Sequence, residues 1–127
     1  MNLTPQQLVA KAKAKIKEID IATAAQHIDA SKRIVDVCEP AEFEAASLQG
    51  AVNILRGVLE FKIGEHPALA NKAAEILLYC KTGGRSALAT LNLQRLGYSN
   101  VCSLSGWFDA WVCQRHAVAK NTIAFGG

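Results

Sequence analysis

The sequence predicts an α/β fold: a mainly parallel β-sheet with helices on both faces. Short apolar runs alternate with segments of helical periodicity along most of the chain, which is typical of repeated strand–helix units with right-handed connections. Half of the 127 residues are apolar, enough for one domain to bury its own core. A glycine-bearing loop joins one of the apolar runs directly to a long helical segment.

Capping signals define the first elements. Thr4, Pro5 and Gln7 are suited to be the N-cap, the first helical residue and the partner in a capping box. Apolar residues then recur at helical spacing at Leu8, Ala12, Ile16 and Ile19. Asp20 is suited to cap a second helix, with its apolar face formed by Ile21, Ala24, Ala25 and Ile28.

Strand and helix candidates alternate along the rest of the chain. The predicted strands are Ile34–Val37, Val52–Ile54, Ile76–Tyr79 and Asn100–Leu104. The predicted helices are Pro40–Ala46, the short helices Gly57–Gly64 and Pro67–Ala74, a long helix through Leu88 to Leu96 that ends at Gly97, and Trp107–Val112.

The loop after the strand Ile76–Tyr79 carries the strongest functional signal. Cys80 ends the strand, Gly83 and Gly84 allow the loop to turn successive N–H groups inward, and the long helix begins next. A helix N-terminus and the neighbouring cations Lys81 and Arg85 favour the nucleophilic thiolate. Because ligands bind outside the carboxyl ends of parallel strands, this loop is the predicted active site.

Three other residues are candidates for supporting roles. Asp36 lies in an apolar strand and is interpreted as a structural acceptor for backbone or loop N–H groups rather than as a proton-transfer group. Arg56 follows the strand Val52–Ile54, where it is either a ligand for an oxyanion donor or an ordinary surface arginine. The hydroxyl of Ser86 is placed to contact the loop backbone or the cysteine sulfur.

The sequence Cys-Lys-Thr-Gly-Gly-Arg-Ser at 80–86 resembles the active-site loop of the rhodanese family, the single-domain sulfurtransferases. Three further segments match that family in order and spacing, over roughly residues 17–118. They are the segment 36–43 (DVCEPAEF), the strand region 50–54 (GAVNI) and the segment 104–111 (LSGWFDAW).

The resemblance implies a rhodanese-like five-stranded sheet in a single domain over residues 1–127. It places an edge strand near residues 17–19 within a core of about 17–118. The capping signals add an N-terminal helix (1–16) before this core, and the tail (119–127), which matches no family motif, is expected to be flexible. It also implies that Cys80 carries a persulfide and that the loop residues bind the donor. Those donor-binding residues are Lys81, Thr82, Gly83, Gly84, Arg85 and Ser86, with Arg56 beside them.

The implied reaction moves a sulfane sulfur from a donor such as thiosulfate to cyanide or a thiol, without a metal or organic cofactor. A protein is also a candidate acceptor. Two rival functions stay open. One is a non-enzymatic persulfide carrier or interaction module, and the other is a phosphatase or arsenate reductase of the same fold, whose loop is one residue longer.

The chain departs from the family pattern at several positions. Cys38 stands where the family usually has an arginine that pairs with acids near Glu42, and Trp107 replaces a glycine. Cys38 is interpreted as a structural substitution, with a resolving thiol that attacks a Cys80 persulfide as the alternative. Trp107 is interpreted either as a roof or partner surface of the pocket or as an indole packed on the sheet.

Composition narrows the function classes. The net charge of +3 is mild and the basic residues are dispersed, so nucleic acid is not an expected partner. We expect no membrane span and no signal peptide, and therefore a cytoplasmic protein. The four cysteines are expected to be reduced, and the three histidines make no recognisable zinc or Cys–His spacing.

Overall fold

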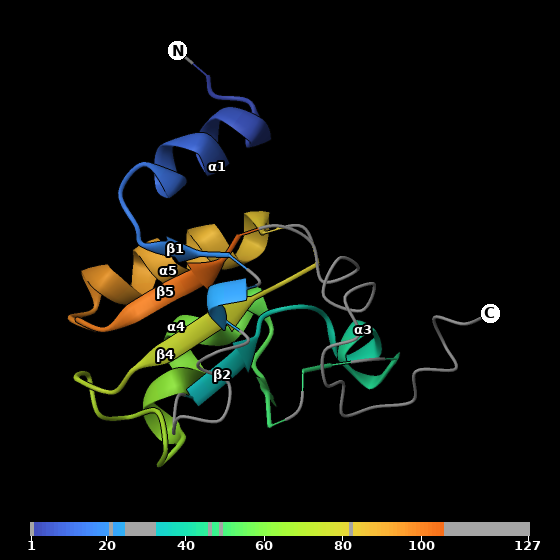
Figure 1. Ribbon diagram of the computed structural model, residues 1–127, viewed down its shortest axis with the longest axis vertical. Helices are drawn as coiled ribbons and strands as arrows, with labels where there is room; N and C mark the ends of the chain where they lie inside the picture. The colour runs from blue at the N-terminus through green and yellow to red at the C-terminus, as the bar shows by residue number, and fades with distance from the viewer. Residues whose placement is uncertain are drawn as a thin grey trace.

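The computed structural model describes residues 2–20, 22–24, 33–45, 47–48, 50–81 and 83–105. Its core is a single sheet of five parallel strands in the order β1-β5-β4-β2-β3 (Figure 1). The strands are β1 (Glu18–Ile19), β2 (Arg33–Asp36), β3 (Val52–Asn53), β4 (Ile76–Tyr79) and β5 (Val101–Leu104). The predicted fold class, including the short edge strand near residues 17–19, is confirmed.

The helices are short apart from the first and the one that follows the central loop. They are α1 (Pro5–Lys13), α3 (Pro40–Ala45), α4 (Leu59–Lys62) and α5 (Gly84–Arg95), with 3-10 turns η1 (Arg56–Val58) and η2 (Ile63–Glu65) flanking α4. In the part of the chain that the structure describes, none of these helices is long and apolar enough to cross a bilayer.

Helix α1 begins as its capping signals predict. The Thr4 hydroxyl accepts a hydrogen bond from the Gln7 amide, and the Gln7 side chain accepts one from the Thr4 amide. The helix ends at Lys13, before the apolar periodicity runs out, because residues 18 and 19 pair with β5 instead. Asp20 also caps as predicted: its carboxylate accepts from the Thr23 amide at 2.8 Å. Residues 25–32, where this second helix was predicted to continue, lie outside the described residues.

Alternation along β4 divides the core into two layers. Ile76, Leu78 and Cys80 face a cluster that includes Leu59 of α4 and Leu93 of α5. Leu77 and Tyr79 face the opposite cluster, which includes Ala24, Leu48 and Leu104. Figure 1 shows α4 and α5 on the same side of the sheet, in agreement with the first cluster. Successive residues of β4 therefore anchor both layers, and Cys80 lies on the α5 side.

Among the described residues, one predicted helix, Pro67–Ala74, is wrong, and the predicted helix Trp107–Val112 lies outside them. Residues 67–74 form consecutive turns and no helix. The turns are closed locally: the Leu69 amide donates to the His66 carbonyl, the Ala74 amide to the Asn71 carbonyl, and the Ala73 amide to the Asn71 side chain. Asparagine side chains that accept hydrogen bonds from nearby amides compete with helix formation. The short apolar periodicity of this segment is therefore not enough to form a helix.

Candidate active site around Cys80

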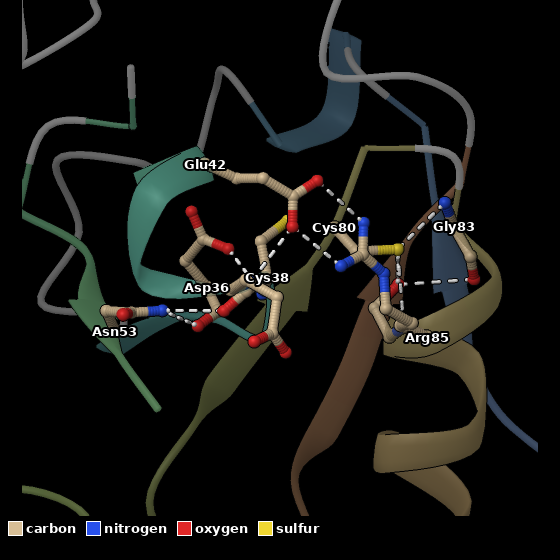
Figure 2. Close-up of polar contacts among 9 residues, drawn as sticks. Asp36, Cys38, Glu42, Asn53, Cys80, Gly83 and Arg85 are labelled. Carbon is tan, nitrogen blue, oxygen red and sulfur yellow. Dashed lines mark hydrogen bonds and ion pairs between the residues drawn. The ribbon is translucent and has the colours of Figure 1, made fainter. Parts of the chain in front are cut away.

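The Cys80 side chain lies directly after β4 and is 1% exposed. Two backbone amides point at its sulfur: the Gly83 N–H at 3.0 Å and the Ser86 N–H at 3.4 Å (Figure 2). Both donors come from the loop and first turn of α5, where helix N–H groups have no partner within the helix. This arrangement stabilises negative charge on the sulfur and on any atom attached to it.

Gly83 makes this geometry accessible to the backbone. It is the N-cap of α5 and has φ of 89° and ψ of −10°, a left-handed conformation that costs L-residues with a side chain about 1–2 kcal/mol. Gly83 thus has the backbone role predicted for the loop glycines. Thr82, its neighbour and a predicted donor-binding residue, lies outside the described residues.

A buried chain of hydroxyl groups lies beneath the sulfur. The Ser86 hydroxyl is 3.7 Å from the Cys80 sulfur and 2.8 Å from the Ser103 hydroxyl of β5. It also donates to the Gly83 carbonyl at 3.3 Å, and both serines are 0% exposed. Thr90 fixes the same turn by donating to the Ser86 carbonyl at 2.8 Å. Ser86 therefore contacts both the loop backbone and the sulfur.

Arg85 is held by an acid from a distant part of the sequence. Its guanidinium donates to both carboxylate oxygens of Glu42 in α3, at 2.8 and 3.1 Å, and Figure 2 shows the two groups facing each other. The hydrogen bonds from Arg85 lower the pKa of Glu42 to about 2, and the pair raises the pKa of Arg85. Lys81 also contributes to the low pKa of Glu42 by charge attraction. Replacement of the family's arginine by Cys38 thus does not leave Glu42 unpaired.

Asp36 is the centre of a second buried network at the carboxyl end of β2. Its carboxylate is 1% exposed and accepts from the Cys38 amide at 2.8 Å. Burial raises the pKa of Asp36, and hydrogen bonds from Cys38 and Tyr79 partly offset that effect. The Asn53 amide group bridges the carbonyls of Asp36 and Cys38, at 3.0 Å each. Asp36 is therefore an acceptor for a backbone N–H group just after β2, and its structural role stays a prediction.

Cys38 is also buried, with 2% of its surface exposed. Burial and the adjacent Asp36 raise the pKa of its thiol. A resolving thiol, the alternative role predicted for Cys38, has to form a thiolate, and this buried environment disfavours that form.

Arg56 lies in η1 and pairs with an acid on its own side of the sheet. Its guanidinium donates to Glu60 at 2.9 Å, and Glu60 also accepts from Asn92 of α5 at 2.7 Å. Trp107 and the tail 119–127 lie outside the described residues. Among the described residues, no group of three or more His, Cys, Asp or Glu side chains could hold a metal ion.

Sequence reasoning missed three contributors to this site: Glu42 as the partner of Arg85, Asn53 and Ser103. Ser103 carried a weak signal, since it is a polar residue within the apolar strand 100–104, as Asp36 is within its strand. The Arg85–Glu42 pair carried no local signal because 43 positions separate the two residues.

Comparisons with known proteins agree with this architecture. A family model described as "Rhodanese-like domain" matches residues 20–114. A sulfurtransferase of Allochromatium vinosum is 28% identical over 105 residues, which cover 81% of this chain and 92% of that protein. Thiosulfate sulfurtransferase 18 of Arabidopsis thaliana is 27% identical, with 92% of this chain and 93% of that protein covered.

A solved structure is similar over almost its full length. It is a Rhodopseudomonas palustris protein of unknown function, described as a possible tyrosine phosphatase. The two share 26% identity with a TM-score of 0.85, and 94% of this chain and 96% of that chain are covered. These proteins are relatives of low identity, so their substrates do not carry over directly.

Proposed function

Because the chain belongs to the rhodanese-like domain family, we propose that it is a sulfurtransferase that carries sulfane sulfur on Cys80. One observation carries the proposal: the Cys80 sulfur, at the carboxyl end of β4, receives the amides of Gly83 and Ser86 at 3.0 and 3.4 Å. Such donors stabilise a sulfur anion before and after it accepts a second sulfur atom.

The reaction proceeds in two displacement steps. First the Cys80 thiolate attacks the outer sulfur of a donor such as thiosulfate, a new S–S bond forms, the donor's S–S bond breaks, and sulfite leaves with the electron pair. An acceptor, cyanide or a thiol, then attacks the outer sulfur and restores the thiolate. Sulfur is transferred without an external oxidant, and the chemistry needs no cofactor. In this scheme the backbone amides of Gly83 and Ser86 bind the anionic sulfur.

Intact-mass spectrometry after incubation with thiosulfate tests this function. We expect one added sulfur atom per chain, release of the sulfur as thiocyanate when cyanide is added, and neither event in Cys80→Ser. Cys102→Ala is the matched control, because Cys102 is also a buried free cysteine but lies within β5. Loading of Cys80→Ser at the wild-type rate would refute the mechanism. Loading without repeated turnover by small acceptors would instead support a persulfide carrier.

The phosphatase alternative has one observation in its favour, the description of the Rhodopseudomonas palustris relative. Against it, only residues 81–84 separate Cys80 from Arg85, one fewer than in phosphatases of this fold. The Arg85 guanidinium, which would have to bind phosphate, is occupied by Glu42. We therefore expect hydrolysis of p-nitrophenyl phosphate to be no faster with wild type than with Cys80→Ser.

A further inference from the structure

The cations beside Cys80 were predicted to attract an anionic donor, yet Arg85 is engaged by a carboxylate. We propose that Glu42 determines donor specificity: by holding Arg85 it makes the site favour an uncharged or singly charged persulfide of a thiol over dianionic thiosulfate. This inference rests on the proposed sulfurtransferase function and adds the class of donor to it.

The geometry of the pair makes Arg85 a poor free ligand. Both oxygens of Glu42 accept from Arg85, so the carboxylate uses the Nη1/Nη2 edge of the guanidinium and compensates its positive charge. The Arg85 and Glu42 side chains are only 36% and 29% exposed, which limits screening by water. A dianionic donor must therefore displace Glu42 before it can use this cation.

Glu42 is itself held in place. One of its oxygens accepts from the Glu39 amide at 2.9 Å, at the start of α3. Movement of the carboxylate away from Arg85 would also break this cap contact. The Glu42 carboxylate of the ion pair is therefore held in place by the start of α3.

The second arginine assigned to donor binding offers no replacement. Arg56 donates to Glu60, which also binds Asn92, so its charge is balanced within its own surroundings. By contrast, the Gly83 and Ser86 amides bind the anionic sulfur on Cys80 whichever leaving group the donor releases. The described residues therefore supply what sulfur transfer needs without a free guanidinium for a second donor charge.

Persulfide transfer balances without a further reactant. The Cys80 thiolate attacks the outer sulfur of R–S–SH, the bond between the two sulfur atoms breaks, and the thiolate RS⁻ leaves with the electron pair. The product is Cys80–S–SH, and one negative charge is present before and after the step. The leaving group carries one charge, whereas sulfite carries two.

Glu42→Gln tests the proposal, because glutamine can still accept from the Glu39 amide but cannot form the ion pair. The measured quantity is the second-order rate constant for loading Cys80, obtained by quenching and intact mass, with thiosulfate and with the persulfide of 2-mercaptoethanol. Since a bidentate pair that is about one-third exposed is modest in strength, we expect thiosulfate loading to rise roughly five- to tenfold and persulfide loading to change by less than about twofold. An unchanged persulfide rate also shows that the variant's site is intact.

Two variants control for charge and for Arg85. Glu39→Gln makes the same change in net charge on the same segment and should leave both rates nearly unchanged. In Glu42→Gln/Arg85→Ala the gain with thiosulfate should disappear. Equal effects of Glu39→Gln and Glu42→Gln, or wild-type loading by thiosulfate as fast as by the persulfide, would overturn the inference while the proposed function stood. No loading of wild type by either donor would reject both.

Discussion

Replacement of Asp36 separates its role as a hydrogen-bond acceptor from its charge. In the wild-type protein the buried Cys38 amide donates to the Asp36 carboxylate at 2.8 Å, and Asp36→Ala removes this acceptor. An unsatisfied buried donor costs about 1–3 kcal/mol, and the void left by the carboxyl group adds about 1 kcal/mol. Relief of the buried charge offsets part of this, so we expect a net loss of about 2–3 kcal/mol in the free energy of unfolding.

Asp36→Asn keeps an acceptor oxygen for the same amide and removes the charge. Its new amide group needs an acceptor, and the Tyr79 hydroxyl, which already receives the Leu48 amide at 2.9 Å, is close to this network. We therefore expect Asp36→Asn to stay within about 1 kcal/mol of wild type at pH 7. Urea unfolding measures both variants, and the alanine midpoint should fall by about 1–2 M for a typical urea dependence.

The pH dependence has a definite sign. The pKa of Asp36 is raised in the folded protein, so the folded state holds its proton at pH values where the unfolded chain has lost it. Wild-type stability from this group therefore falls as pH rises from the unfolded value near 3.8 through the folded pKa. The stability of Asp36→Asn relative to wild type should increase from pH 4 to pH 7. A constant difference, or an asparagine variant as unstable as the alanine variant, would refute this account of Asp36.

Two further predictions concern the loop and the layer beneath it. Gly83→Ala should lower the free energy of unfolding by about 1–2 kcal/mol because residue 83 has a positive φ, and thermal unfolding measures this loss. The variant should also load sulfur on Cys80 more slowly, because the amide of residue 83 moves away from the Cys80 sulfur. Intact mass measures the loading, and loading at the wild-type rate would contradict this role of Gly83. Ser103→Ala should lower the free energy of unfolding by about 1 kcal/mol, because the Ser86 hydroxyl loses its hydrogen-bond partner at 2.8 Å. For the same reason, iodoacetamide should alkylate Cys80 more slowly in this variant. Alkylation at the wild-type rate would show that Ser103 acts on packing alone.

Local patterns in the sequence predicted the elements that depend on local forces. The capping box at Thr4 is one example, and the strand, glycine loop and helix around Cys80 are another. In both cases the decisive contacts join residues within a few positions of each other, so spacing alone carries the information. Residues 67–74 show the limit of such reasoning, since side-chain bonds from Asn71 outcompete a weak helical period.

The partners of the site could not be predicted in this way. Asn53 bridges the carbonyls of Asp36 and Cys38, at and just after the end of β2, only because β3 pairs with β2 in a register that sets Asn53 beside Asp36. Ser103 meets Ser86 because β5 lies beside β4 and its residue 103 is opposite Leu78. Such contacts depend on strand order and register, which no single segment of the sequence specifies.

Cys38 lies between the Asp36 network and the segment that carries Glu42. A cysteine there brings no cation to the end of β2, and its buried thiol, with a raised pKa, lies beside Asp36 rather than acting as an exposed nucleophile. Glu42, four residues further on, then has Arg85 as its partner, and the cation nearest the start of α5 is neutralised by a residue of α3. Position 38 therefore supplies no cation that could compete with Arg85 for the Glu42 carboxylate. The Arg85–Glu42 pair then sets which donor the loop accepts under the proposal above, while the amides that hold the sulfur remain in place.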